Sequence, residues 1–95
     1  MGRAIMTHSS DNVATLVTGI TANQLVDIVN GQQESKLESK ENIQFGHKLA
    51  VMNIGAGENV IKYGEVIGKA LKDIEAGQHV HIHNVESQRG RGDRK

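Results

Sequence analysis

Three histidines stand at every second position near the C-terminal end of the 95-residue chain: His79, His81 and His83. Neutral imidazole is a common ligand of iron and zinc, and near neutral pH it also takes up and releases protons. Because a β-strand turns successive side chains to opposite faces, a strand here would present all three imidazoles on one face. Val80 and Ile82 would then be buried on the other face. The row is therefore a candidate metal or anion site, with a solvated edge strand as the structural alternative.

Two other groups of side chains could take part in chemistry. His8 precedes Asp11 and Asn12 in a turn-like segment, and His47 and Lys48 follow a glycine where a strand is expected to begin. A lysine can neutralise a substrate carboxylate, and a histidine can move a proton. Because adjacent strand residues point to opposite faces, at most one of His47 and Lys48 is expected to face a given pocket. Each group also has a structural interpretation, as a turn or as a solvated strand end.

Composition excludes several classes of partner. The 11 basic and 11 acidic residues cancel, so the overall charge gives no indication of nucleic acid or an anionic membrane as a partner. There is no cysteine, which excludes disulfides and thiol chemistry and fits a reducing compartment. No apolar run is long enough to span a bilayer, and the first residues lack the apolar core of a signal peptide. We therefore expect one cytoplasmic domain.

Glycine punctuates the chain, with 11 glycines and no proline. Glycine supplies positive φ without steric cost, and short β-branched segments between such turns are typical of all-β domains. Asn30-Gly31 is the strongest hairpin signal, because both residues tolerate positive φ. Residues 32–42 are polar and charged, which favours an exposed return strand. Strands are expected over residues 4–8, 13–18, 25–29, 32–42 and 46–54, in two pieces between 60 and 74, and over 79–85.

A short internal repeat supports the placement of the turns. Residues 53–61 and 73–81 share the form Asn or Asp, Ile, any residue, Ala, Gly, then two residues and Val. Residues 19–26 follow the same form more loosely. The repeat predicts a tight glycine-containing turn after an isoleucine, whether by duplication or by independent use of the same turn chemistry.

Four blocks in order carry a resemblance to a known family: His8-x-x-Asp11-Asn12-Val13-Ala14, Gly46-His47-Lys48-Leu49-Ala50, residues 60–68 (VIKYGEVIG) and residues 79–84 (HVHIHN). Together they resemble the N-terminal SAF domain of the altronate dehydratase family, which includes galactarate dehydratase and the two-subunit sulfolactate sulfo-lyase. The resemblance covers residues 4–93. It departs over residues 30–42, which are more polar than expected, and over residues 20–24, which lack the usual proline. It implies a mainly β domain of the β-clip, SAF-like type over residues 1–87, followed by a flexible polar tail over residues 88–95.

The resemblance also implies an activity. The family eliminates water from a sugar acid, or bisulfite in the sulfo-lyase, and a divalent metal, usually iron, assists. The metal is useful because a hydroxyl group leaves poorly until a Lewis acid or a proton takes its charge. Most altronate and galactarate dehydratases carry this domain fused to a catalytic domain. This chain ends after the polar tail, so we expect a small subunit of a lyase that is inactive alone, with a separate large catalytic subunit that holds most of the metal site. Homo-oligomerisation stays open.

Two alternatives remain beside the sugar-acid dehydratase. One is the α subunit of a sulfolactate sulfo-lyase. The other is a non-enzymatic carbohydrate-binding SAF module, which would need a regular threonine-rich face that Thr7, Thr15, Thr18 and Thr21 do not form on one strand ladder.

The resemblance implies roles for individual residues toward a small hydroxy-acid substrate, a metal ion and the partner subunit. The expected catalytic residues are His8 and His47; the expected substrate-binding residues are Asp11, Asn12, Lys48 and Asn84; the expected metal ligands are His79, His81 and His83; and the expected docking residues for the large subunit are Arg89 and Arg91. The basic tail lacks the interleaved aromatics of a nucleic-acid site.

Overall fold

The computed structural model of the protein describes residues 2–87 and assigns no helix among them. The mainly β class predicted from the glycine-punctuated sequence is therefore confirmed. The predicted tail at residues 88–95, with Arg89 and Arg91, lies outside the described residues. Within residues 2–87 the strands are β1 (Gly2–Met6), β2 (Val13–Leu16), β3 (Leu25–Asn30), β4 (Gln33–Glu38), β5 (Lys48–Ala50), β6 (Asn59–Lys62), β7 (Glu65–Ala70), β8 (His79–Val80) and β9 (Val85–Ser87).

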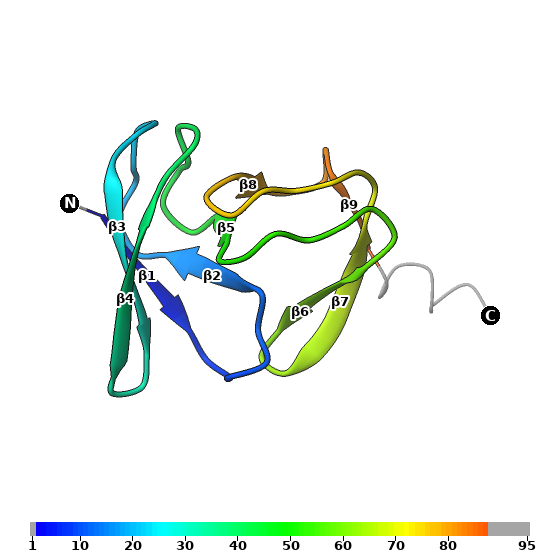
Figure 1. The fold of residues 1–95 in the computed structure, drawn as a ribbon, viewed down its shortest axis with the longest axis horizontal. Helices are drawn as coiled ribbons and strands as arrows, with labels where there is room; N and C mark the ends of the chain where they lie inside the picture. The colour runs from blue at the N-terminus through cyan, green and yellow to red at the C-terminus, as the bar shows by residue number, and fades with distance from the viewer. Residues whose placement is uncertain (1, 88–95) are drawn as a thin grey trace.

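These strands form two sheets. The larger sheet has the order β4-β3-β1-β2-β5-β8, and the smaller has the order β6-β7-β9. Neighbouring strands are antiparallel except for β1 and β3, which are parallel. Figure 1 shows β1, β3 and β4 toward one end of the long axis and β6, β7 and β9 toward the other, with β5 and β8 between them. The middle of the molecule is thus made of short strands that join its two halves.

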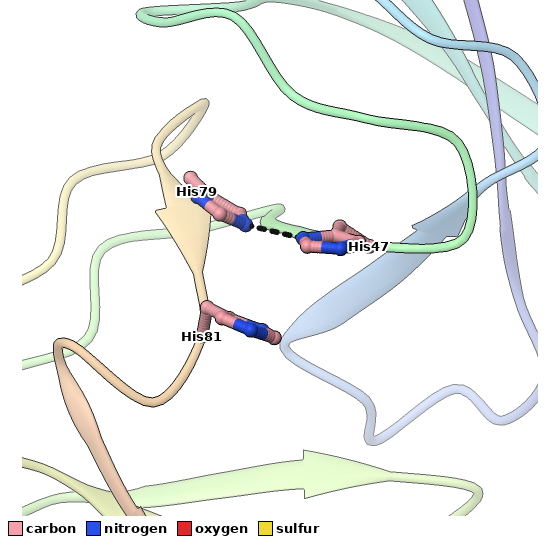
Figure 2. A group of neighbouring side chains, drawn as sticks. All are labelled: His47, His79 and His81. Atoms are coloured by element: carbon pink, nitrogen blue, oxygen red, sulfur yellow. Dashed lines mark hydrogen bonds between the residues drawn. The ribbon is translucent and has the colours of Figure 1, made fainter.

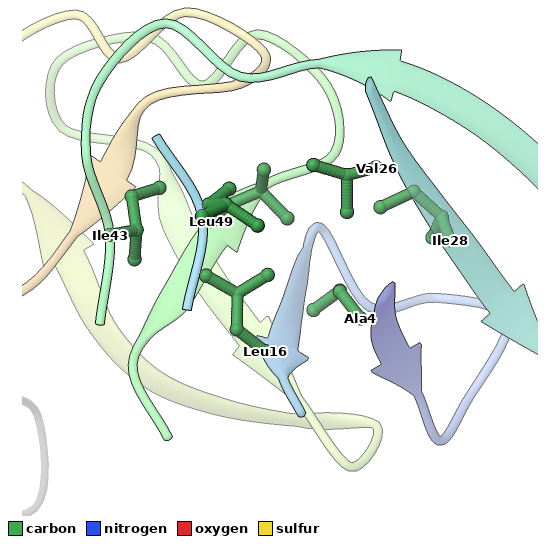
Figure 3. Close-up of a cluster of buried hydrophobic side chains, with 8 residues drawn as sticks. Ala4, Leu16, Val26, Ile28, Ile43 and Leu49 are labelled. Atoms are coloured by element: carbon green, nitrogen blue, oxygen red, sulfur yellow. The ribbon is translucent and has the colours of Figure 1, made fainter. Parts of the chain in front are cut away.

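Two hydrophobic clusters share the central strands β2 and β5. Ala14 of β2 and Leu49 of β5 face the first cluster, part of which is drawn in Figure 3, whereas Val13 and Ala50 face the second. All four side chains are at most 1% exposed. Since successive strand residues point to opposite faces, β2 and β5 are buried on both sides. This double burial fixes the backbone directly after His47.

Two tight hairpins connect strands, one near the turn that the sequence predicted and one within the region where it predicted two short strands. In the β3–β4 hairpin Asn30 pairs with Gln33, so the loop residues are Gly31 and Gln32. The prediction that Asn30 and Gly31 form the turn was therefore wrong by one position: Gly31 has φ +64°, but Asn30 stays in the strand. The exposed return strand predicted over residues 32–42 is present but shorter, as β4, of which only Leu37 is half-buried; Ser39, just beyond it, is buried. Between β6 and β7, both Tyr63 and Gly64 have positive φ, as a two-residue type I′ turn requires.

Four turns share one geometry, one more than the sequence repeat indicated. In each, an isoleucine comes first, a residue with positive φ comes fourth, and the fifth N–H donates to the second carbonyl. The first and second turns pair through an Ile20–Ile43 bridge, and the third and fourth through an Ile54–Ile74 bridge. The turn after Ile43 is the one that the sequence comparison missed. The turns begin at Ile20, Ile43, Ile54 and Ile74.

The predicted strand over residues 79–85 was wrong. Only His79 and Val80 are in β8; residues 81–84 form a turn, and β9 then joins the smaller sheet. Val80 is 1% exposed as expected, but Ile82 is 80% exposed, which contradicts its predicted burial. The cause is Asn84, whose side chain bonds to the backbone of the preceding residues and turns the chain. The predicted strand at residues 46–54 is likewise reduced to β5.

No helix in residues 2–87 has the length and apolar character needed to cross a membrane.

Candidate histidine site

The site is built from three imidazoles that come from two distant segments. His47 Nδ1 lies 2.9 Å from His79 Nε2, and the rings of His47, His79 and His81 stack with centroids 4.6–5.3 Å apart. One ring nitrogen from each residue lies within 4.8 Å of the other two. Figure 2 shows His47 on the loop that enters β5, facing His79 and His81 across a short gap. We call these three residues the histidine cluster.

Strand pairing and hydrogen bonds from neighbouring side chains hold the backbone of His79 and His81 in place. Pairing of β5 with β8 places Leu49 opposite His79, so the two segments meet at a fixed register. The His79 N–H donates to Glu41 Oε2 over 2.9 Å. Asn84 Nδ2 donates to the His79 carbonyl, and Asn84 Oδ1 accepts from the His81 N–H, at 2.8 and 2.9 Å. Asn84, which we predicted to bind substrate, is 3% exposed and is occupied in positioning the two histidines.

His47 departs from the pattern of the four related turns. In the other three, the side chain at the fifth position closes its own turn by accepting the second residue's N–H at 2.8–2.9 Å. His47 holds that fifth position, but its ring pairs with His79 instead. The turn-closing side chains are Gln24, Glu58 and Gln78.

The pKa shifts of His79 and His81 both favour neutral imidazoles. The pKa of His79 is lowered by burial first and then by repulsion from His47, His83 and His81, against a weaker opposing effect of Glu41. The pKa of His81 is lowered by burial and then by His47, Lys48 and His83. A histidine whose pKa falls below its ordinary 6.5 is neutral at pH 7, so it can accept a proton or bind a metal ion.

A lysine lies on the other side of His81. Lys48 is half-buried, and its pKa is lowered by burial and then by repulsion from Lys62. Lys48 has no ion pair among residues 2–87, where the salt bridges are Lys36–Asp27 and Lys40–Glu75. An open pocket of about 190 Å³ is lined by Lys48, Ile67, Val80, His81, Ile82, Val85 and Ser87. This arrangement of a poorly solvated cation beside a pocket favours an anionic ligand.

The side chains of His47 and Lys48 thus face different sites, as the alternation of strand residues predicted. His47 belongs to the histidine cluster, whereas Lys48 lines the pocket. His81 takes part in both, because it stacks on His47 and lines the pocket with Lys48.

His83 contacts the histidine cluster but is not part of it. Its ring lies 5.2 Å from that of His79 and is tilted by 42°, and it is not among the three residues whose ring nitrogens lie within 4.8 Å of one another. It lines a separate hollow of about 410 Å³ together with Lys40, Glu41, Lys72, Asp73, Gln78 and Asn84. The predicted row of three histidines is therefore replaced by a set in which His47 takes the place of His83.

The structure places the predicted Asp11 and Asn12 in structural hydrogen bonds. Asp11 is 1% exposed. Its carboxylate accepts hydrogen bonds from the backbone N–H groups of Thr7, Tyr63 and Gly64 and from the Thr7 hydroxyl group. Burial raises the pKa of Asp11, but these hydrogen bonds outweigh burial, so its net pKa falls below 3.8. Asn12 bonds through its side chain to the Asn59 carbonyl and the Ile61 N–H, at 2.9 and 2.8 Å. Both residues join the loop after β1 to the β6–β7 hairpin.

His8 also lies outside the histidine cluster. Its Nδ1 is 2.8 Å from Ser10 Oγ and accepts the Ser10 N–H at 3.1 Å. The ring rests against Gly64, where an added Cβ would come within 2.8 Å of His8 Cδ2. Gly64 is favoured by its φ of +74°, and an added Cβ there would displace the exposed His8 ring. His8 therefore lies against the Tyr63-Gly64 turn, whose N–H groups donate to the Asp11 carboxylate.

The comparisons with known proteins agree with this fold. The sequence matches the family described as altronate/galactarate dehydratase SAF domain over residues 2–88. The protein therefore belongs to a class of small mainly β domains found in dehydratases and lyases, and within it to the altronate/galactarate dehydratase SAF domain family.

Three relatives illustrate the range of that family. The chain is 35% identical to the (2R)-sulfolactate sulfo-lyase subunit alpha of Chromohalobacter salexigens, over 86% of this chain and 92% of the relative. It is 40% identical to the altronate dehydratase of Escherichia coli K12, over 87% of this chain but 16% of the relative. It is 37% identical to the galactarate dehydratase (L-threo-forming) of the same organism, over 80% of this chain and 14% of the relative. The chain thus spans nearly all of the first relative and about a sixth of the other two.

Proposed function

We propose that this chain is the small subunit of a two-component lyase that eliminates water from a sugar acid. It would act in the cytoplasm with a separate large subunit, and it would be inactive alone. The observation that carries the proposal is the placement of Lys48, a half-buried cation with no ion pair in residues 2–87, in a pocket that it lines together with His81 of the histidine cluster. Family membership and the match to a lyase α subunit along 92% of its length support the small-subunit role.

The arrangement suits the first step of such an elimination. Removing the proton next to a carboxylate builds negative charge on the carboxylate oxygens, which a nearby ammonium group stabilises. Lys48 is the residue we assign to this carboxylate. The histidine cluster can serve the elimination in either of two ways: without a metal ion its neutral imidazoles can take up the proton, and with one bound they would hold a Lewis acid that takes the charge of the leaving hydroxyl. The large subunit would supply the remaining groups.

Release of bisulfite from sulfolactate is the second candidate reaction. The observation that favours it is the coverage of two sulfolactate sulfo-lyase α subunits, each matched along 92% of its length. The same Lys48 and histidine cluster would serve, because sulfolactate also carries a carboxylate next to the carbon that loses a proton. The two reactions differ in the leaving group, which these residues do not select.

The test is reconstitution. The chain is purified with a dehydratase-like large subunit encoded beside it, and both the complex and the isolated chain are assayed with altronate, galactarate and sulfolactate. We expect turnover of one substrate by the complex only. Turnover by the isolated chain, or a complex inactive on all three substrates, would refute the proposal.

A matched pair of lysine variants tests the role of Lys48 within that complex. A charge-assisted hydrogen bond is worth about 1.5–3 kcal/mol, so Lys48→Met should lower kcat/KM by about 10- to 150-fold. Lys69→Met removes an exposed lysine of β7 and should leave kcat/KM unchanged. Equal kcat/KM values for the two variants would remove Lys48 from the substrate site.

A further inference from the structure

We propose that His47, His79 and His81 bind one divalent first-row transition-metal ion, that the isolated chain binds it without a partner subunit, and that His83 is not a ligand. The proposal concerns ion binding by this chain, so it stands or falls independently of the lyase reaction. Imidazole nitrogens suit zinc, iron, nickel and copper, whereas magnesium and calcium prefer oxygen ligands. The donor set therefore selects for a transition metal.

The spacing of the three nitrogens fits one ion. In a tetrahedral site with metal–nitrogen bonds of about 2.0–2.1 Å, two ligand nitrogens lie about 3.3 Å apart. His47 Nδ1 and His79 Nε2 are 2.9 Å apart and would separate by about 0.4 Å. All three ligand nitrogens lie within 4.8 Å of one another, so the largest closure needed is about 1.5 Å, and the stacked rings must also rotate about their side-chain torsions to aim their nitrogens at one ion.

The backbone behind these rings is fixed before any ion arrives. His79 is held at its N–H by Glu41 and at its carbonyl by Asn84, which also holds the His81 N–H. His47 donates its N–H to Gln44 and accepts from the Leu16 N–H at its carbonyl. Ligands positioned in this way lose little conformational freedom on binding, which favours affinity.

The turn repeat provides an independent argument for His47. Three related turns use a glutamine or glutamate at the fifth position to close the turn through its Oε1. The turn that begins at Ile43 has His47 there, so it lacks the local side-chain hydrogen bond that closes the other three. The ring nitrogen meets His79 instead. At a position where related turns carry glutamine or glutamate, His47 therefore lacks the turn-closing hydrogen bond and is free to act as a metal ligand.

Three protein ligands leave at least one coordination position for another group. Closed structural zinc sites have four protein ligands, whereas reactive sites have three and keep a position for water or substrate. Lys48 lies beside His81 in the adjoining pocket, where it could attract an anionic group to that position. The site is thus of the open type, able to receive an oxygen ligand from a small acid or from a partner.

The test uses the isolated full chain, without an affinity tag and freed of metal by a chelator. Co²⁺ and Zn²⁺ are titrated at pH 7.5, with visible absorption for Co²⁺ and calorimetry for Zn²⁺. We expect one ion per chain, and an affinity at least about 100-fold weaker in His47→Gln, His79→Gln and His81→Gln. His83→Gln and His8→Gln should stay within about threefold of the original chain, because neither residue belongs to the histidine cluster.

Three results would overturn the proposal: no saturable binding by the original chain, a loss in His83→Gln as large as that in His47→Gln, or unchanged affinity in His47→Gln. Misfolding is controlled by His47→Gln itself, because glutamine is the residue that the related turns carry at this position. Its melting temperature without metal is measured beside the titration and should match or exceed that of the original chain.

Discussion

His47 and His79 meet nitrogen to nitrogen at 2.9 Å although 32 residues separate them in the chain. The contact depends on β5 and β8 pairing in register and on His47 standing at the end of a turn whose relatives close with glutamine or glutamate. The stability of that turn and the function of the ring can therefore be separated by mutation.

His47→Gln should stabilise the metal-free chain or leave it unchanged. The new Oε1 can accept the turn N–H as in the related turns, which is worth about 0.5–1.5 kcal/mol. His79→Gln gains no such bond and is the matched comparison. Urea unfolding without metal measures both. With Zn²⁺ present at 100 times its Kd, the original chain should gain about 2.7 kcal/mol and His47→Gln should gain much less. A destabilised metal-free His47→Gln would contradict the interpretation of the turn.

Asn84→Ala should destabilise the fold and disturb the histidine cluster together. The substitution leaves the His81 N–H and the His79 carbonyl without their side-chain partner, at a cost of about 1–3 kcal/mol. Asn59→Ala is the control, since Asn59 is exposed and its backbone carbonyl, which the change preserves, is what Asn12 contacts. Urea unfolding and Co²⁺ titration are run on both variants. Full stability in Asn84→Ala would show that another group can hold the turn.

Burial should separate two isoleucines that the sequence alone treats alike. Ile82→Ala should change the free energy of unfolding by no more than about 0.5 kcal/mol, because its side chain is 80% exposed. Ile74→Ala should cost about 2–5 kcal/mol, because Ile74 is 1% exposed within the second cluster. Chemical denaturation of the two variants decides the point, and a large loss from Ile82→Ala would place the strand as first predicted.

Asp11 should make the fold sensitive to acid. Its folded pKa lies below the ordinary 3.8, so the stabilisation it gives is present above that value and is lost as the pH falls through the folded pKa. Asp11→Asn weakens the hydrogen bonds to Tyr63 and Gly64 at every pH and should cost about 1–3 kcal/mol at pH 7. The difference in unfolding free energy between the original chain and Asp11→Asn should shrink below about pH 4.

Asp27→Asn is the control for losing a carboxylate. It breaks the ion pair with Lys36, whose side chain is 58% exposed, and such surface pairs are worth about 0–1 kcal/mol. Unfolding is followed from pH 7 to pH 2 for all three proteins. A constant difference between Asp11→Asn and the original chain across that range would remove Asp11 as the acid-sensitive group.

Local chemistry made part of this fold predictable from the sequence. The β3–β4 hairpin, to within one residue, and the exposed strand β4 follow from turn residues and charge pattern, which act within a few residues. The end of strand β8 after Val80 could not be predicted in this way. Alternation of histidine with apolar residues indicates a strand wherever no side chain competes for the backbone hydrogen bonds. Asn84 is that competitor, and its bonds to His79 and His81 decide the outcome.

The site was predictable in its residues but not in their grouping. His47, His79 and His81 were each candidates, yet their meeting depends on the β5–β8 pairing, which no local pattern encodes. The available signal was the turn repeat, since aligning residues 43–47 with the other three turns shows a histidine in the place of glutamine or glutamate. Asp11 illustrates the reverse case, because its partners Tyr63 and Gly64 are more than 50 residues away.

Lys48 should give the reconstituted lyase a KM that rises at alkaline pH. Burial and the charge of Lys62 lower the pKa of Lys48 from 10.5, so its ammonium charge is present below the lowered pKa and is lost as the pH rises through it. Binding of a carboxylate substrate should therefore weaken at a lower pH than an ordinary lysine would impose. Lys48→Arg keeps its charge throughout, since the pKa of arginine is above 12.

The ratio of KM in the original complex to KM in the Lys48→Arg complex is the measurement, because other titrating groups affect both enzymes alike. We expect this ratio to rise with pH in the alkaline range. Lys69→Arg, a change at an exposed lysine of β7, should reproduce the original pH profile. If the ratio stays flat up to pH 10.5, Lys48 does not hold the substrate anion, and the proposed division of roles between Lys48 and the histidine cluster fails.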